Sequence, residues 1–237
     1  MDIKGWVRTS LIDFPGHIAA VVFTGGCNFR CPMCHNADLV LRPGELPSFE
    51  LGAIWEFLRR RAGKITGLVV TGGEPTLHPD LAAFLAEARD LGYAVKLDTN
   101  GYRPDVLAEL LDQNLVDFVA MDVKAPPESY GLLAGVPDID LDLISASLSV
   151  LCEGRARVEF RTTVVPGLLA PDDIEAIARW VAGLGATPGV TYVLQQFRGG
   201  STLDAGLAAV TPYTSDRLRQ MAECARLWLP DVTVRGI

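Results

Sequence analysis

The residues with the clearest capacity for chemistry are three cysteines, Cys27, Cys31 and Cys34, in the segment GGCNFRCPMCHN. Their Cys-x3-Cys-x2-Cys spacing would align on one helical face, but two glycines and a proline in the segment disfavour a regular helix. Compact loops of this kind supply the thiolate ligands of iron–sulfur clusters. Three ligands for a four-iron cluster would leave one iron open to a small molecule.

A structural zinc site is the main alternative for this spacing. His35 directly follows Cys34 and would nominally complete a Cys3His set. Adjacent residues rarely reach one tetrahedral ion, however, and zinc sites usually pair two ligand clusters far apart in sequence. The two remaining cysteines, Cys152 and Cys224, lie singly in helical patterns, where a free cysteine behaves as a small apolar residue. The spacing therefore favours an iron–sulfur cluster.

Short β-rich segments alternate with amphipathic helical patterns along the whole chain. The predicted strands are residues 18–24, 67–71, 93–98, 116–122, 157–165, 191–197 and 232–235. Helical patterns include residues 48–61, 79–92 and 171–185. Such alternation indicates right-handed βαβ units and a parallel sheet, that is, an α/β fold. Since no linker, repeat or low-complexity tract interrupts it, we expect a single domain over residues 1–237.

Polar, glycine-rich segments follow most of the predicted strands. The cysteine loop follows the first strand, TGGEPTLHP the second, DTNG the third and DVKAPP the fourth. Arg161 and Thr163 lie near the end of the fifth strand, and Gln195 and Gln196 near the end of the sixth. Because the carboxyl ends of parallel strands share one edge of a sheet, these segments predict a single site there.

The composition is that of an ordinary globular protein, with 237 residues of which 49% are hydrophobic and 21% charged. We expect no membrane span, because no run approaches roughly 18 apolar residues. The N-terminal MDIKGWVRTS lacks the apolar core of a secretory signal, so the expected location is the cytoplasm. The net charge of −8 argues against non-specific binding to nucleic acid.

CNFRCPMC followed by GGEP resembles the radical S-adenosylmethionine (SAM) superfamily. The resemblance implies a partial, laterally open (β/α)6 barrel in which Cys27, Cys31 and Cys34 hold a [4Fe-4S] cluster. SAM would bind the open iron through the amino and carboxylate groups of its methionine. An electron from the cluster would then cleave SAM to a 5′-deoxyadenosyl radical.

The resemblance also assigns residues to the SAM pocket. Gly72, Gly73, Glu74 and the proline after them would hold the methionine amino group, and glycines permit the close backbone approach that this needs. Met33 stands before the third cysteine, where the superfamily usually has an aromatic side chain near the adenine. A polarizable thioether can also pack on a purine.

Longer segments resemble the glycyl-radical-enzyme activases. SLIDFPGHIAAVVFTGGCNFRCPMCHN is similar to the start of the activating proteins of anaerobic ribonucleoside-triphosphate reductase. DTNG, DVK and RTTVVPG follow in the order seen in activases of the pyruvate formate-lyase type. The resemblance implies that Asp13, in DFPG, lies where the glycine loop of a partner enzyme is held.

Five further residues receive roles from this resemblance. Asp98 would contact SAM through the ribose or beside a bound monovalent cation, and Asp122 would join that network. Lys124 would pair with the SAM carboxylate, while Arg161 and Thr163 would line the pocket. Taken singly, each motif is equally typical of a turn, a helix cap or a surface ion pair. Their shared edge and their order favour a site.

The reaction implied is activation of a partner protein. A flavodoxin- or ferredoxin-like donor would supply one electron, and the deoxyadenosyl radical would take a hydrogen from the α-carbon of a glycine in the partner. Two alternatives stay open: a radical SAM enzyme acting on a small molecule, such as a 7-carboxy-7-deazaguanine synthase-like enzyme, and a non-catalytic iron–sulfur or zinc module. The lack of further cysteine clusters in the sequence favours the minimal activase.

Overall fold

The computed structural model of the chain describes residues 1–186 and 189–237 and divides into two compact units. The N-terminal unit consists of Met1–Asn28, Asp38–Thr99 and Asp105–Ala120. The C-terminal unit consists of Phe29–Ala37, Asn100–Pro104 and Met121–Ile237. The boundary therefore passes through the cysteine loop, between Cys27 and Cys31. The assignment of residues 1–237 to one domain stays a prediction.

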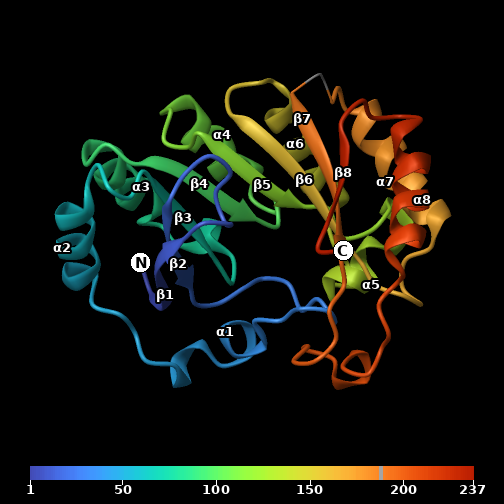
Figure 1. The fold of residues 1–237 in the computed structure, drawn as a ribbon, viewed down its shortest axis with the longest axis horizontal. Coiled ribbons are helices and arrows are strands. Elements are labelled where there is room, and N and C mark those ends of the chain that lie inside the picture. The colour runs from blue at the N-terminus through green and yellow to red at the C-terminus, as the bar shows by residue number, and fades with distance from the viewer. Residues whose placement is uncertain (187–188) are drawn as a thin grey trace. The chain divides into compact units, whose positions relative to one another are not determined.

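The N-terminal unit is built on β1 (Ile3–Ser10), β2 (Ala19–Thr24), β3 (Gly67–Gly72) and β4 (Ala94–Thr99) (Figure 1). β1 is antiparallel to β2, whereas β2, β3 and β4 run parallel. Its helices are α1 (Ala37–Leu41), α2 (Leu51–Arg61), α3 (Leu81–Asp90) and α4 (Pro104–Asp112), with short 3-10 turns at Pro43–Glu45 and Pro75–Leu77. The parallel strands follow from buried β-branched runs joined by helices, as the sequence predicts.

One face of these strands carries an apolar cluster. Alternate residues of a strand point to the same face, and this cluster consists of Phe14, Ala19, Val21, Val69, Phe118 and Ala120. All six are almost completely buried. The cluster lies toward the amino ends of the parallel strands, so the loops at their carboxyl ends are left to carry polar residues.

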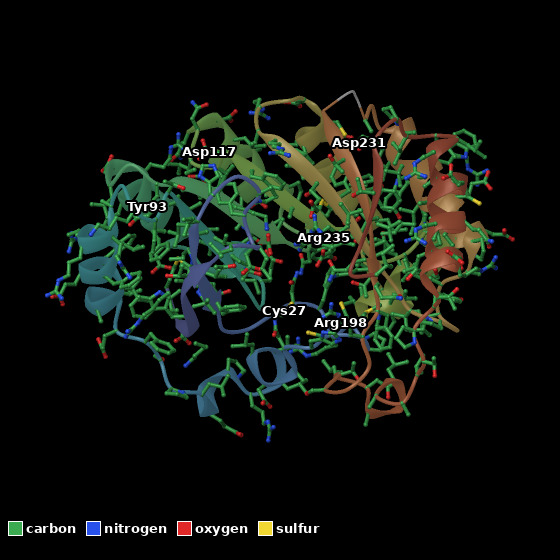
Figure 2. All side chains as sticks on the ribbon, viewed as in Figure 1. Cys27, Tyr93, Asp117, Arg198, Asp231 and Arg235 are labelled. Carbon is green, nitrogen blue, oxygen red and sulfur yellow. The ribbon has the colours of Figure 1, made fainter. Side chains whose placement is uncertain are left out.

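The C-terminal unit contains β6 (Arg157–Val164), β7 (Val190–Gln196) and β8 (Val232–Arg235), all parallel. Its helices are α5 (Tyr130–Ala134), α6 (Leu141–Cys152), α7 (Pro171–Gly183) and α8 (Ser215–Arg226), with 3-10 turns at Pro127–Ser129 and Ala205–Leu207. α7 and α8 pack against each other. Arg235, labelled in Figure 2, donates to both carboxylate oxygens of Glu159 at 2.8 and 2.6 Å and so joins β8 to β6.

β5 (Phe118–Asp122) spans the boundary between the two units, and the strand order is β1-β2-β3-β4 within the N-terminal unit and β6-β7-β8 within the C-terminal unit. The predicted α/β class is confirmed, and each of the seven predicted strands is present to within two residues.

Two local features differ from the sequence prediction. β1 is an additional strand, whose pattern IKGWVRTS is half-exposed and interrupted by Lys4 and Arg8. The helix predicted from residue 48 begins at Leu51, because Ser48 donates to Asp2 and accepts from Lys4 instead of capping the helix. None of the helices in the described residues is both long and apolar enough to cross a membrane.

Candidate active site

Cys27 lies on the loop that leaves β2, in the N-terminal unit (Figure 2). The loop turns at Gly26, whose φ of +82° lies in the region that glycine adopts without steric cost. The Gly26 N–H donates to the Leu39 carbonyl at 2.8 Å, which fixes the start of the loop. Among the described residues none of the five cysteines forms a disulfide bond.

The GGEP loop after β3 packs directly on the start of the cysteine loop. Gly73 N–H donates to the Thr24 carbonyl at 2.9 Å, and Glu74 N–H donates to the Gly26 carbonyl at 2.8 Å. A Cβ atom on Gly73 would lie 1.9 Å from the Gly26 oxygen, so only glycine permits this approach. His78 adds a third connection, because its Nε2–H donates to the Gly25 carbonyl at 3.1 Å.

Glu74 is almost completely buried in the N-terminal unit, with 1% exposure. Its Oε1 accepts from the Thr76 amide at 3.1 Å, the Thr76 hydroxyl at 2.6 Å and the Thr99 hydroxyl at 2.8 Å. A carboxylate with several such donors is satisfied without water. Glu74 therefore joins the loop after β3 to the end of β4, a role that the sequence did not indicate.

Asp98, near the end of β4, is paired with a lysine that the sequence analysis missed. Lys96 lies two residues earlier, on the same strand face, and its Nζ donates to Asp98 Oδ1 at 2.5 Å. The Lys96 side chain is 5% exposed and the Asp98 side chain 17%. A polar residue between Val95 and Leu97 in a strand is the signal that could have revealed it.

Cys31 and Cys34 lie in one turn of the C-terminal unit, where the Cys34 N–H donates to the Cys31 carbonyl at 3.0 Å. The turn is attached to the end of α5: the Arg30 N–H donates to the Ala134 carbonyl at 2.8 Å, and the Cys31 thiol lies 3.8 Å from the same oxygen. Gly135, with φ of +66°, makes this possible, since a Cβ there would lie 2.2 Å from the Arg30 oxygen.

The segment after β7 supports the same turn from another direction. Leu203 N–H donates to the Cys34 carbonyl, and Asp204 N–H donates to the Pro32 carbonyl, both at 2.9 Å. The Nε2–H of His35 donates to the carbonyl of Arg198 at 2.8 Å. Residues 203–204 and Gly135 carry no recognisable motif, so sequence analysis could not connect them with the cysteines.

Asp122, Lys124 and Arg161 form one ion cluster in the C-terminal unit. Lys124 Nζ lies 2.8 Å from Asp122 Oδ2, and Arg161 Nε lies 2.8 Å from Asp122 Oδ1. Burial disfavours the ionised carboxylate, but the charges of Arg161 and Lys124 outweigh it and hold the pKa of Asp122 well below its usual range. Burial also disfavours the Lys124 ammonium, but the Asp122 charge raises the Lys124 pKa above its usual value.

The ion cluster lies beside the cysteine turn. Burial raises the pKa of the Cys31 thiol, and the positive charge of Lys124 partly opposes that increase. Iron and zinc bind the thiolate form, which a neighbouring cation stabilises. The soft sulfur donors of Cys31 and Cys34, next to a cation, thus fit an iron–sulfur ligand set in their chemistry.

The remaining predicted residues are placed as follows. Thr163 lies on β6 two residues after Arg161 and is half-buried, and Met33 is buried with 8% exposure. Asp13 is exposed in the turn between β1 and β2, where its Oδ2 accepts from the Ser10 hydroxyl. Gln196 Nε2 donates to the Tyr213 carbonyl at 2.6 Å.

Within the described residues no three His, Cys, Asp or Glu side chains form a metal-binding group.

Replacement of Asp122 by Asn should destabilise the protein by about 2 to 3 kcal/mol, because it leaves Lys124 and Arg161 close together without their counter-charge. The expected loss is smaller than for a fully buried ion pair, because solvent partly screens these side chains. Urea unfolding measures the change. The control is Asp216→Asn, which removes an exposed pair with Arg219 and should cost at most about 0.5 kcal/mol.

The stability difference between wild type and Asp122→Asn should depend on pH in a defined direction. The lowered pKa of Asp122 gives a contribution that is complete above the unfolded pKa of about 3.9 and is lost as pH falls below it. The raised pKa of Lys124 gives a contribution that is complete below about pH 10.4 and is lost as pH rises above it. The difference between wild type and Asp122→Asn should stay constant from about pH 5 to 9. A steady change within that window would contradict the charge assignment.

Comparison with known proteins identifies the family. Residues 21–185 match the radical SAM superfamily. The chain is 32% identical to "Putative glycyl-radical enzyme activating enzyme MJ1227" of Methanocaldococcus jannaschii, over 99% of this chain and 96% of that protein. It is 30% identical to the pyruvate formate-lyase-activating enzyme of Streptococcus mutans, over 68% of this chain and 64% of that protein.

A solved structure supports the fold. A domain of a pyruvate-formate lyase-activating enzyme from Bacteroides vulgatus superposes with a TM-score of 0.58 at 19% identity, covering 72% of this chain and 99% of that domain. The sequence match spans well over half of the chain and includes the three-cysteine loop, the GGEP loop and the ion cluster. The chain therefore belongs to the radical SAM superfamily, whose enzymes use a [4Fe-4S] cluster and SAM, and it is a radical SAM enzyme.

Proposed function

We propose that this protein is a glycyl-radical-enzyme activase, which cleaves SAM reductively and generates a glycyl radical on a partner enzyme. The observation that carries the proposal is the extent of the similarity to the M. jannaschii protein, which covers 99% of the chain. It continues beyond residue 185, where the superfamily match ends, and so includes β7, α8 and β8. The similarity thus concerns the whole chain and not only the cofactor loops.

Cys27, Cys31 and Cys34 are proposed to hold the cluster. When bound, the cluster and SAM supply the one-electron reduction and the carbon–sulfur cleavage that yield a 5′-deoxyadenosyl radical. The protein's own contribution is positioning. The connection of the GGEP loop to Gly25 and Gly26 fixes that loop against the start of the cysteine loop.

The pocket residues receive the following roles. Gly72, Gly73 and Glu74 would hold the SAM amino group, and the buried Met33 would pack on the adenine. Asp98, oriented by its lysine partner, would accept a hydrogen bond from a ribose hydroxyl.

The ion cluster of the C-terminal unit also receives a proposed role in binding SAM. Lys124 would pair with the SAM carboxylate while it keeps its contact with Asp122, and Arg161 fixes that aspartate from its other oxygen. Thr163 would line the pocket on β6, on the same strand face as Arg161.

The protein substrate is proposed to be anaerobic ribonucleoside-triphosphate reductase, with the glycine loop held near Asp13. The turn that carries Asp13 is internally fixed, since the Ser10 oxygen also accepts from the Ile12 and Asp13 amides, both at 3.2 Å. A flavodoxin or ferredoxin would supply the electron, in the cytoplasm, where thiols stay reduced.

The test combines the reconstituted protein, SAM, a reductant and the candidate reductase under anaerobic conditions, and records electron paramagnetic resonance spectra. We expect a carbon-centred doublet that disappears when the acceptor glycine of the reductase is replaced by alanine. Asp13→Asn should lower radical formation on the reductase by about tenfold or more, because the variant loses one well-placed contact to the glycine loop. It should leave SAM cleavage without the partner unchanged.

One outcome would contradict the activase class, and another would contradict only the named partner. Cleavage of SAM coupled to turnover of a small molecule, without a protein radical, would indicate a small-molecule radical SAM enzyme. A protein radical on pyruvate formate-lyase but not on the reductase would keep the activase class and reject the named partner. The acceptor-glycine variant serves as the control in both cases.

A further inference from the structure

Lys96 is an unusual residue for the place it occupies. It lies in the middle of β4, between Val95 and Leu97, and is 4% exposed. Its Nζ lies 2.5 Å from Asp98 Oδ1 and 5.7 Å from the centre of the Phe118 ring. Phe118 belongs to the apolar cluster of the N-terminal unit. A lysine ammonium is therefore held at the boundary between an apolar core and Asp98.

Stability alone does not explain a cation at this position. Removing an ammonium from water is costly even when a carboxylate is nearby, and apolar residues of similar volume usually stabilise such a site equally or better. A methionine or leucine would pack well against Phe118. What the lysine adds is positive charge and a charge-assisted hydrogen bond at Asp98, which fixes the orientation of that carboxylate.

That charge bears on the monovalent cation that the activase resemblance places beside Asp98. A bound Na⁺ or K⁺ needs carboxylate oxygens whose negative charge is available to it, and a second cation close to the ammonium is repelled at short range. The Lys96–Asp98 pair has a net charge of zero, with its ammonium already on the carboxylate. Asp98 thus suits a hydroxyl donor better than a metal cation.

Asp122, in the C-terminal unit, is the other carboxylate that the resemblance assigns to the cation network, and it too is already paired with positive charge. Asp122 accepts from Lys124 at one oxygen and from Arg161 at the other, so the three side chains together carry a net charge of +1. A group with a positive net charge disfavours a further cation. The charges present therefore do not fit the cation that the resemblance implies.

We propose that the Lys96 ammonium supplies, from within the chain, the positive charge that a bound monovalent cation would bring to Asp98. SAM binding and cleavage by this protein then require neither Na⁺ nor K⁺. The inference rests on the radical SAM chemistry of the chain and holds whatever molecule the radical acts on, so it can fail or succeed independently of the activase proposal.

The first experiment uses the wild-type protein with its cluster. Choline is the only added cation, and the reductant is a photoreduced deazaflavin, which avoids sodium dithionite. Na⁺ or K⁺ is then titrated at constant ionic strength while SAM affinity is measured by equilibrium dialysis and 5′-deoxyadenosine by chromatography. We expect changes below about threefold, which is about 0.65 kcal/mol. A saturable increase above that limit would overturn the proposal.

The second experiment uses Lys96→Met, Lys96→Arg and the exposed control Lys64→Met. In choline, Lys96→Met should bind SAM about tenfold more weakly, or about 1.4 kcal/mol, and Na⁺ or K⁺ should restore part of that affinity. Lys96→Arg and Lys64→Met should behave as wild type. A purely structural role would not produce cation-dependent recovery, and circular dichroism verifies folding. Wild-type affinity of Lys96→Met in choline, or a loss that neither arginine nor a cation restores, would show that the charge is not what matters.

Discussion

Replacement of Cys31 by alanine should abolish the iron–sulfur cluster and lower 5′-deoxyadenosine formation to background, a loss of at least about a hundredfold. The cysteine turn has no residue that could substitute, because its backbone is fixed by contacts to Ala134, Leu203 and Asp204. The measurements are iron and sulfide content after anaerobic reconstitution, and deoxyadenosine after reduction with SAM.

The matched control is Cys152→Ala. Cys152, at the end of α6, is a free thiol with the same 8% exposure as Cys31. Burial raises the pKa of Cys152 to about 11, so it stays protonated and unreactive. The variant should keep its cluster and its activity and lose about 1 kcal/mol of stability. A full cluster with normal SAM cleavage in Cys31→Ala would reject the proposed ligand set.

Gly73→Ala should give the second large effect, because the added methyl group would meet the Gly26 carbonyl oxygen at 1.9 Å. Both elements are backbone, so no side-chain rotation can relieve the contact. We expect a loss of about 1 to 3 kcal/mol of stability or more, as for other overpacked sites. SAM binding should weaken as well, since the displaced segment carries both the GGEP loop and the start of the cysteine loop.

The control for this prediction is Gly52→Ala in α2. A Cβ at Gly52 meets nothing within 4 Å, and alanine is the better helix former, so the variant should be neutral or gain up to about 1 kcal/mol. Urea unfolding and equilibrium dialysis with SAM apply to both variants. If Gly73→Ala is as stable and binds SAM as tightly as Gly52→Ala, the close approach of the two loops is not required in solution.

The sequence by itself determined the strand positions and the chemistry. Strand segments such as residues 67–71 were predictable because burial on both faces leaves a continuous apolar run, which is a local property of the chain. The cysteine spacing and the GGEP motif indicated the chemistry, because a cluster ligand set and a close backbone approach each require particular residue types at short range. Since parallel strands end at one edge, a single site at that edge was a further prediction from the sequence.

Only the tertiary structure decided which partners those residues have. From the sequence alone, Lys96 could equally have been a solvent-exposed lysine. The structure shows that it is buried and paired with Asp98 on the same face of the strand. Gly135 and Leu203 support the cysteine turn from more than a hundred residues away in the chain, with no motif that links them to it. Long-range contacts of this kind depend on how the elements pack, and short-range patterns in the sequence do not encode them.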